Sequence, residues 1–189
     1  TGLSAADETT SFEPRSPYAV AKSAAFWMVS NYKIAYGVQA CSGILFNHES
    51  PFRPDRFVTQ KIVLAAINAS KEGDGTLRLG NIDIERDWGW APEYVEAMSL
   101  MIQNDPLDDF VIATGESYPL REFVSRAFSY FDLEWENYVT LDEKLTRPMD
   151  IAMSRGNPMK ANSVLSWEAK STLKDVVHAM IEEKVNPGQ

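Results

Sequence analysis

The sequence predicts an α/β protein. Short apolar runs typical of buried strands alternate along the chain with longer segments whose apolar residues recur at helical spacing. Of the 189 residues, 44% are hydrophobic and 11% aromatic, which is ample for a packed core. The strands that these runs predict are too few for a complete doubly wound sheet, so we expect only part of such a fold.

The first expected helix carries clear signals at both ends. Ser16 offers an N-cap, Pro17 suits the first helical position and Gly37 is typical of a helix end, so the sequence predicts a helix over 17–36. The apolar stretch VQACSGILF that follows predicts a buried strand, and NHESPFRP has the composition of a loop. Residues 1–15 are polar and turn-rich, and no regular structure is expected there.

The rest of the chain continues the alternation of helices and strands. Helical spacing occurs in RFVTQKIVLAAINASKEG, PEYVEAMSLMIQND, PLREFVSRAFSYFDL and STLKDVVHAMIEEK, the last capped by Ser171 or Thr172. Short strands are expected in TLRLG and DFVIAT, whereas RDWGWA interrupts the pattern and RPMDIAMSRGNPMKANSVLSW is expected to be largely loop. The apolar residues of PLREFVSRAFSYFDL that should face the core are Leu120, Phe123, Val124, Ala127 and Phe128.

Composition argues against a nucleic-acid-binding protein, a disulfide-linked protein and a membrane-spanning protein. A formal net charge of −9 disfavours a nucleic-acid surface, although local basic pockets for a phosphorylated ligand remain compatible with it. The single cysteine, Cys41, cannot form an internal disulfide, which fits a reducing cytoplasm. No apolar run approaches the ~18 residues of a membrane span, and the first residues do not resemble a signal peptide. We expect an acidic cytoplasmic protein without nucleic-acid, membrane or metal partners.

Tyr18 and Lys22 are the first candidate catalytic residues. Residues four apart share one face of a helix, so the phenol and the ammonium can act at one point in space. A neighbouring cation favours the phenolate, through which a tyrosine can exchange protons with an alcohol. An isolated Tyr-x-x-x-Lys also arises by chance on ordinary amphipathic helices, so the surrounding sequence has to decide.

That surrounding sequence resembles a known family. SPYAVAKSAAF is similar to the active-site helix of the extended short-chain dehydrogenase/reductases that act on nucleotide sugars. GILFNHESPFR narrows the resemblance to GDP-mannose 4,6-dehydratase, and FVTQKI, LGNIDIERDWGWAPEYVEAM, DFVIATGESYPLREFV and RPMDI continue it in the same order. The resemblance implies an incomplete Rossmann-like fold with the C-terminal part of its parallel sheet, followed by a smaller α/β substrate-binding domain.

The resemblance also implies roles for particular residues. Tyr18 would be the base that removes the proton of the sugar 4-hydroxyl, and Lys22 would hold the nicotinamide ribose of NADP. His48 and Arg53 would contact the cofactor as well, and without the family His48 is more simply a loop-capping residue. A guanidinium such as that of Arg53 can donate two parallel hydrogen bonds to phosphate oxygens.

By the same likeness, the substrate GDP-mannose would contact residues in several of the matched segments. Each charged residue among them, taken singly, reads as a solvated surface residue, and it is the matched segment that favours a role in binding. These substrate contacts are expected to be Asn47, Lys61, Arg86, Arg147 and Asp150. Trp88 and Trp90 are expected to pack in the core rather than to stack on a base.

Two features of the family have no counterpart in this sequence. It contains no glycine-rich turn for the cofactor pyrophosphate. Thr1 does not correspond to the threonine of the family's Thr-x-Glu pair, because Leu3 lies where the glutamate would be. We therefore expect a C-terminal portion, with 1–50 as the end of the NADP-binding domain and 51–189 mainly as the substrate domain. Residues from about 82 to 95 would return to the NADP-binding domain.

Three functions stay open at this point. The first is a nucleotide-sugar 4,6-dehydratase, a lyase of GDP-fucose-type biosynthesis, whose isolated 189-residue portion is expected to be inactive. The second is an epimerase or reductase of the same family, which shares the tyrosine and lysine. The third is a non-catalytic nucleotide-sugar binding module. By the resemblance we expect a homodimer or homotetramer.

Overall fold

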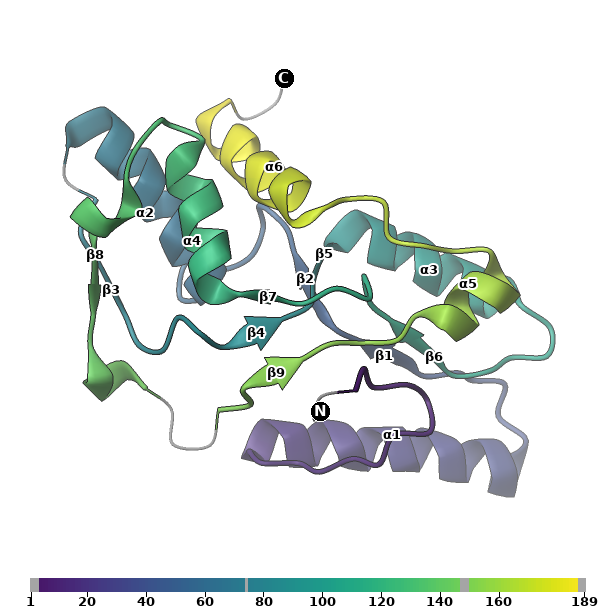
Figure 1. The fold of residues 1–189 in the computed structure, drawn as a ribbon. Helices are drawn as coiled ribbons and strands as arrows, with labels where there is room; N and C mark the ends of the chain where they lie inside the picture. Colours follow the sequence, from purple (N-terminus) through teal and green to yellow (C-terminus); the bar gives the residue numbers. More distant parts are fainter. Residues whose placement is uncertain (1–3, 74, 147–149, 187–189) are drawn as a thin grey trace.

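The computed structural model describes residues 4–73, 75–146 and 150–186, which form an α/β fold (Figure 1). The helices are α1 (Pro17–Tyr36), α2 (Val58–Glu72), α3 (Ala91–Gln103), α4 (Leu120–Ser129), α5 (Met159–Leu165) and α6 (Leu173–Val185). The strands are β1 (Gly43–Leu45), β2 (Asn47–Glu49), β3 (Leu77–Leu79), β4 (Glu85–Arg86), β5 (Trp88–Trp90), β6 (Phe110–Ile112), β7 (Tyr118–Pro119), β8 (Val139–Leu141) and β9 (Met153–Ser154). Two 3₁₀ turns, Trp135–Asn137 and Glu143–Leu145, flank β8.

The strands pair mainly in parallel between distant parts of the chain. β1 pairs with β6, β2 with β5 and β3 with β8, all in parallel, and β4 lies between antiparallel β7 and parallel β9. Parallel neighbours need long crossover connections, which the helices supply. The predicted α/β class, with pieces of a parallel sheet, is therefore confirmed.

Apart from α1, the helices pack in two apolar clusters. α2, α4 and α6 bury their apolar faces together against β3 and β5, whereas α3 and α5 cover β6 on the other side of the molecule (Figure 1). The five apolar positions predicted for α4 are all buried in the first cluster. Trp88 is 3% exposed and packs edge-on against Phe123, as a packing residue should.

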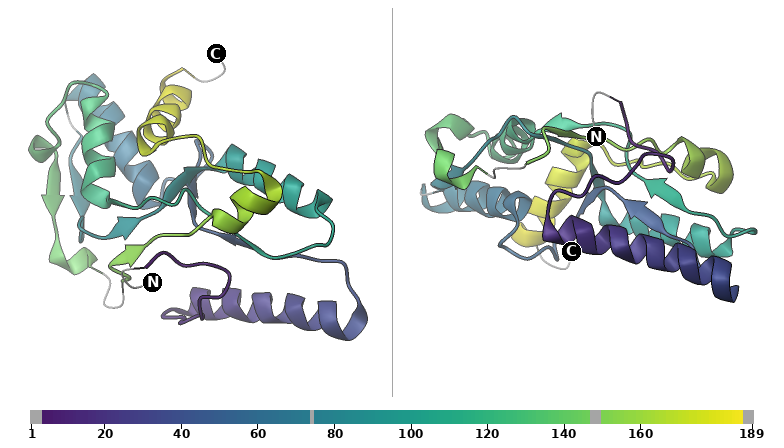
Figure 2. Two further views of the ribbon diagram at one scale, coloured as in Figure 1. Left: turned by 45° about the vertical axis from the view of Figure 1, so that its right-hand side comes forward. Right: turned by 90° about the horizontal axis from the view of Figure 1, so that it is seen from below.

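α1 lies along one edge of the molecule (Figures 1 and 2). Its predicted signals are confirmed: the Ser16 hydroxyl accepts a hydrogen bond from the Ala19 N–H, and Gly37 ends the helix with φ 65°. None of its residues is buried, and Trp27 remains 62% exposed. An ion pair between Lys33 and Asp109, 3.3 Å, fastens its last turn to the segment before β6.

Several local predictions were wrong. The apolar stretch 38–46 forms a strand only where β6 lies beside it, so β1 is short. Asn47 and His48 lie in β2 rather than in a loop, because β5 pairs with them. RDWGWA supplies β4 and β5, and the expected loop 147–167 contains β9 and α5, which buries Ala161 and Leu165. These short elements are set by tertiary pairing and carry little periodicity of their own.

Asp87, between β4 and β5, is a buried carboxylate that joins three segments. Its Oδ1 accepts hydrogen bonds from the backbone N–H and the hydroxyl of Thr114, at 2.9 and 2.8 Å. Its Oδ2 accepts from the N–H groups of Gly115 at 3.1 Å and Gly156 at 3.3 Å. Burial raises the pKa of Asp87, and these donors act in the opposite direction. The carboxylate thereby holds the loop after β6 and the loop after β9 against β4 and β5.

Glu49, at the end of β2, is a second buried carboxylate. The Thr59 hydroxyl on α2 donates to its Oε2 at 2.7 Å, and Arg53 lies within 3.0 Å of the same oxygen. Burial raises the pKa of Glu49, and Arg53 and Thr59 lower it. The strand is thus tied both to α2 and to the loop that connects them.

Replacing Asp87 by alanine should destabilise the fold strongly. The N–H groups of Thr114, Gly115 and Gly156 would lose their acceptor, so we expect a loss of about 2–4 kcal/mol in the free energy of unfolding. Asp83→Ala is the control, because its ion pair with Arg121 is exposed and should cost less than about 0.5 kcal/mol. Urea unfolding measures both variants, and equal losses would contradict the role of Asp87.

The pH dependence of stability should change in Glu49→Gln. Because the folded pKa of Glu49 is raised above 4.5, its stabilising contribution is fully present below that pH and is lost as the pH rises through the folded pKa. The native chain should therefore lose stability relative to the variant as the pH increases. Urea unfolding at a series of pH values checks this. If the free energy of unfolding of the native chain minus that of the variant stays constant or increases with pH, the prediction is wrong.

Candidate functional site

Tyr18 and Lys22 lie on one side of the first turns of α1. The Lys22 ammonium is 5.8 Å from the centroid of the Tyr18 ring, and the phenol is 73% exposed. Pro17 and the Ser16 cap fix the start of this helix, so they also fix the direction of both side chains. An exposed phenol beside an ammonium can give a proton to, or take one from, a bound alcohol.

Asn47 and His48 lie side by side in β2, opposite Trp88 and Gly89 of β5. His48 Nδ1 is 2.8 Å from the carbonyl oxygen of Phe46, and its ring lies against Tyr94 with a centroid separation of 5.0 Å. Side chains of consecutive strand residues point to opposite faces, so the Asn47 and His48 side chains lie on different faces of the sheet. Both side chains are only half-buried, which leaves each accessible to a ligand.

Arg53 is held in place by contacts from three directions. Glu49 approaches its Nε at 3.0 Å, its Nη1 donates to the carbonyl oxygen of His48 at 3.2 Å, and its guanidinium lies over the ring of Phe57 at 4.3 Å. A guanidinium has five N–H donors, so these contacts orient the group without using its whole capacity. Arg53 is thereby held against the backbone of His48, the other residue expected to contact the cofactor.

Arg86 and Asp150 form an ion pair at 2.6 Å. Arg86 Nη1 also donates to the carbonyl oxygens of Glu85 and Ile151, both at 2.7 Å. The structure thus unites two residues that the sequence placed in the substrate site. Part of the guanidinium's function is structural, because it fastens the segment before β9 to β4.

The remaining expected substrate residues are less tightly placed. Lys61 lies in the first turn of α2 and is exposed, so its ammonium is free to move toward an anion. Arg147 lies outside the described residues.

Two residues of this region were missed from the sequence. Glu49 orients Arg53, and its spacing of four residues from that arginine, within a matched segment, was the available signal. Asp87 anchors the loops beside Arg86, but an acid next to an arginine in a short strand gives no indication of burial.

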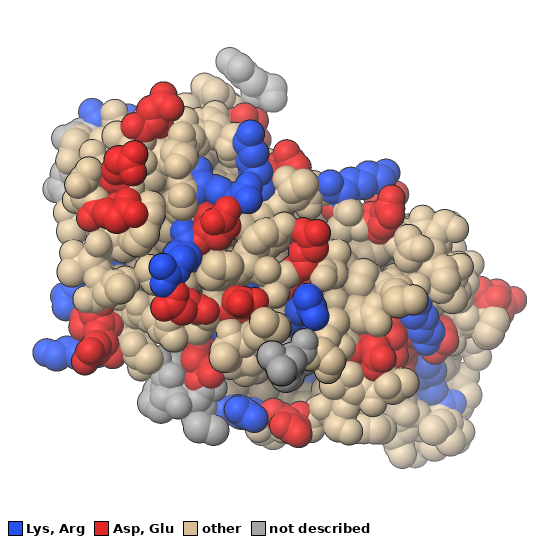
Figure 3. Space-filling view, in the orientation of Figure 1, with Lys and Arg blue, Asp and Glu red and all other residues tan. Residues whose placement is uncertain are grey.

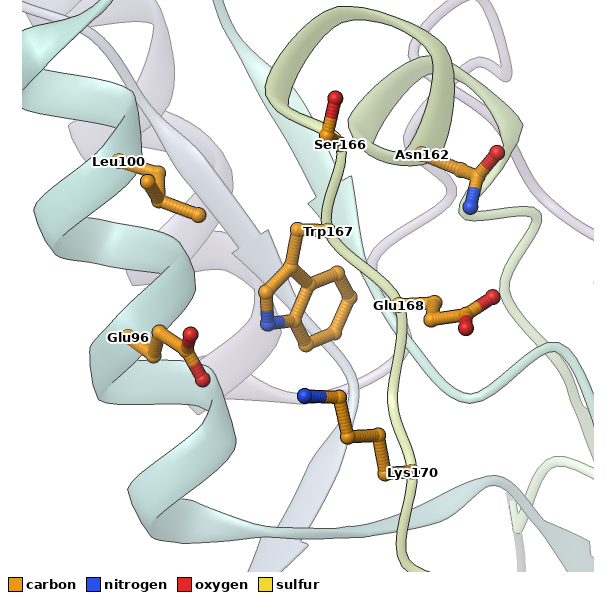
Figure 4. Close-up of a pocket in the computed structure, with 7 residues that line it drawn as sticks. All are labelled: Glu96, Leu100, Asn162, Ser166, Trp167, Glu168 and Lys170. Carbon is orange, nitrogen blue, oxygen red and sulfur yellow. The ribbon is translucent and has the colours of Figure 1, made fainter.

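A separate open cavity of about 340 Å³ lies beside α3 and α5 and contains none of the expected site residues (Figure 4). Its lining residues are Glu96, Leu100, Asn162, Ser166, Trp167, Glu168 and Lys170. Within the described ranges, no three His, Cys, Asp or Glu side chains are grouped closely enough to hold a metal ion. Nor is any helix among those residues long and apolar enough to cross a membrane.

Known proteins give a consistent comparison. The family model described as GDP-mannose 4,6 dehydratase matches residues 2–180. The GDP-mannose 4,6 dehydratase of Dictyostelium discoideum is 45% identical, covering 94% of this chain and 55% of its own length. GDP-mannose 4,6 dehydratase 1 of Arabidopsis thaliana is 48% identical over 93% of this chain and 49% of its own length. The chain therefore spans about half the length of these curated relatives.

Solved structures share the fold at lower identity. RMD from Pseudomonas aeruginosa, complexed with NADPH, superposes with a TM-score of 0.82 at 21% identity, over 95% of this chain and 59% of that one. dTDP-glucose 4,6-dehydratase from Bacillus anthracis, in complex with NAD, gives 0.86 at 17% identity, over 98% and 58%. The fold is thus that of the extended short-chain dehydrogenase/reductases, and by its sequence the chain belongs to the GDP-mannose 4,6-dehydratase family.

Proposed function

We propose that this chain provides the catalytic tyrosine helix and the nucleotide-sugar site of a GDP-mannose 4,6-dehydratase. The observation that supports the proposal most directly is the pairing of Tyr18 and Lys22 on an exposed face of α1, in a chain that matches this family over residues 2–180. The product would be GDP-4-keto-6-deoxymannose, and the enzyme would act in the cytoplasm as a homodimer or homotetramer.

In the proposed reaction, Tyr18 takes the proton of the sugar 4-hydroxyl as the alcohol is oxidised. The Lys22 ammonium stabilises the phenolate and holds a ribose hydroxyl of the cofactor. Loss of water across C5 and C6 follows, because the 4-keto group makes the C5 proton acidic. There is no net change in oxidation state between the sugar substrate and the product.

A nicotinamide cofactor, which we propose to be NADP, would accept hydride from C4 and return it to C6. The donor set fits such a group, since the Lys22 ammonium and the guanidinium of Arg53 suit ribose hydroxyls and phosphate oxygens. His48, in β2, would contact the same cofactor molecule. Glu49 keeps the Arg53 guanidinium oriented while leaving part of its donor capacity for a phosphate.

GDP-mannose would lie against Asn47 on β2 and against cations from two other elements. Lys61 would attract the diphosphate, and Arg86 would do so from β4. Asp150, held by Arg86, would accept hydrogen bonds from the ribose or the guanine edge. We include Arg147 in the same group from the sequence resemblance alone.

We also propose that residues 1–50 belong to the NADP-binding domain and 51–189 mainly to the substrate domain. The parallel pairing of β2 with β5 supports the return of the 82–95 segment to the first domain. Because the chain contains no glycine-rich turn, we propose that the isolated 189 residues do not turn over substrate. The full-length product of the gene that contains this sequence is the material for the tests below.

Incubation of that product with GDP-mannose and NADP tests the activity itself. We expect a 4-keto-6-deoxy sugar nucleotide, detected by mass and by its alkaline absorbance, and no accumulation of NADPH. An epimerised sugar with its 6-hydroxyl retained would favour a related epimerase. Binding of GDP without any turnover would favour a non-catalytic module.

Tyr18→Phe should lower kcat by about 10²–10⁴-fold, because it removes the group that moves the proton. The KM for GDP-mannose should change little, since the ring itself remains. Tyr32→Phe on the same helix is the matched control, because Tyr32 is also exposed and should retain activity. Steady-state kinetics decide, and equal activity of the two variants would contradict the role of Tyr18.

Lys61→Gln should weaken GDP binding by about tenfold, because it removes an ammonium proposed to contact the diphosphate. Lys71→Gln, in the last turn of the same helix, makes the same change of charge away from the proposed site. Isothermal titration calorimetry compares the two variants. Similar affinities in both would show that Lys61 makes no specific contact with GDP.

A further inference from the structure

The groove between α4 and α6 has an accessible lining that is mostly apolar, and it also carries cationic and hydroxyl groups of side chains that the proposed reaction does not use. It forms a cavity of about 400 Å³. The lining residues are Arg126 and Ser129 of α4, Tyr130 just after it, and Lys174 and His178 of α6. None of the five carries a carboxylate, although the chain as a whole has a formal net charge of −9.

The two helices present these groups toward each other. Lys174 and His178 are four residues apart on α6 and so share one face of that helix. The His178 ring meets the Tyr130 ring edge-on, with centroids 4.8 Å apart, which fixes the imidazole at the wall of the groove. α4 and α6 are held together by the buried core beneath them.

Acidic residues nearby only partly offset this charge. Glu122 binds Arg126 through one oxygen, which is 2.9 Å from both Nε and Nη2. A guanidinium has further N–H donors beyond those two atoms. Asp175 accepts hydrogen bonds from the Thr172 N–H and hydroxyl at the N-cap of α6, and its carboxylate also interacts electrostatically with His178 and Lys174. In Figure 3, lysine and arginine side chains lie next to acidic ones in the region that α4 and α6 occupy in Figure 1.

The groove is separate from the candidate reaction site. It includes none of the residues proposed to bind the cofactor or GDP-mannose. In Figures 1 and 2, α6 and the catalytic helix α1 lie on opposite sides of the molecule. A ligand in the groove would therefore not occupy the position of the substrate.

We propose that the α4/α6 groove binds a phosphate group, either as inorganic phosphate or on a small organic ester. Arg126 and Lys174 supply charge, the hydroxyls of Ser129 and Tyr130 supply hydrogen bonds, and His178 supplies a ring N–H. A volume of about 400 Å³ also falls within the range of small-molecule sites, so an ester's organic part has room beside the Tyr130 ring.

The two histidines of the chain give a direct readout, because His48 belongs to the candidate reaction site and His178 to the groove. Imidazole NMR signals of the full-length gene product are followed at constant pH and ionic strength while inorganic phosphate, ribose 5-phosphate or neutral ribose is added. His178→Gln identifies the groove signal. The His48 signal is followed in the same spectra, so that binding at the candidate reaction site is distinguished from binding in the groove.

We expect a saturable shift of the His178 signal with inorganic phosphate or with ribose 5-phosphate, and none with ribose. The anion that binds more tightly identifies the source of the phosphate group. Lys174→Gln should weaken this binding by about tenfold, whereas Lys184→Gln, the same change on the last turn of α6, should leave it unaltered. GDP affinity should be the same in both variants, which separates this proposal from the proposed function.

Either of two results would overturn the phosphate site. One is a His178 signal that does not saturate with either anion. The other is equal weakening in Lys174→Gln and Lys184→Gln, which would show a general charge effect. Lys174 is exposed, so its substitution should leave folding intact, and the urea midpoint of each variant verifies this.

Discussion

The buried Asp87 carboxylate is the contact on which the arrangement of the candidate site depends. It is 0% exposed, and it accepts hydrogen bonds from segments that follow β6 and β9. Gly156 can approach it only because it lacks a side chain, since a Cβ there would lie 2.3 Å from the Cβ of Ala113. A carboxylate taken out of water must be matched by such donors, so the three segments cannot separate without exposing an unsatisfied group. Arg86 precedes Asp87 in the chain, so the hydrogen bonds of Asp87 also fix the position of Arg86.

A similar constraint acts at β2. Glu49 orients Arg53 and also binds Thr59 of α2, so the proposed cofactor contact and the packing of a helix depend on one carboxylate. Arg86 shows the same combination, because the guanidinium that we propose to meet the diphosphate also fastens Asp150 and Ile151. In both cases a phosphate would add to an existing network instead of ordering a loose side chain. Such preorganisation lowers the entropy cost of binding.

The sequence predicted those elements whose signals lie within a few neighbouring residues. It did not predict elements that form only by pairing with a distant part of the chain. Ser16, Pro17 and Gly37 act within a few residues of each other, so both ends of α1 could be predicted. The five buried residues of α4 follow from helical spacing alone. Trp88 and Trp90 form a strand only because β2 lies beside them, and α5 is too short to show a period. For the site, the family resemblance supplied residue types, whereas the ion pairs Glu49–Arg53 and Arg86–Asp150 became visible only in three dimensions.

The exposure of Tyr18 bears on how the proposed chemistry could work. Two charges about 4 Å apart attract each other by only about 1 kcal/mol in water, and by several times more once water is displaced. The Tyr18 side chain is 73% exposed, so water screens its contact with Lys22. A sugar nucleotide and a cofactor bound against α1 would cover both side chains and strengthen the attraction at the moment of proton transfer. Bound substrate would therefore complete the proton-transfer pair that we propose acts on it.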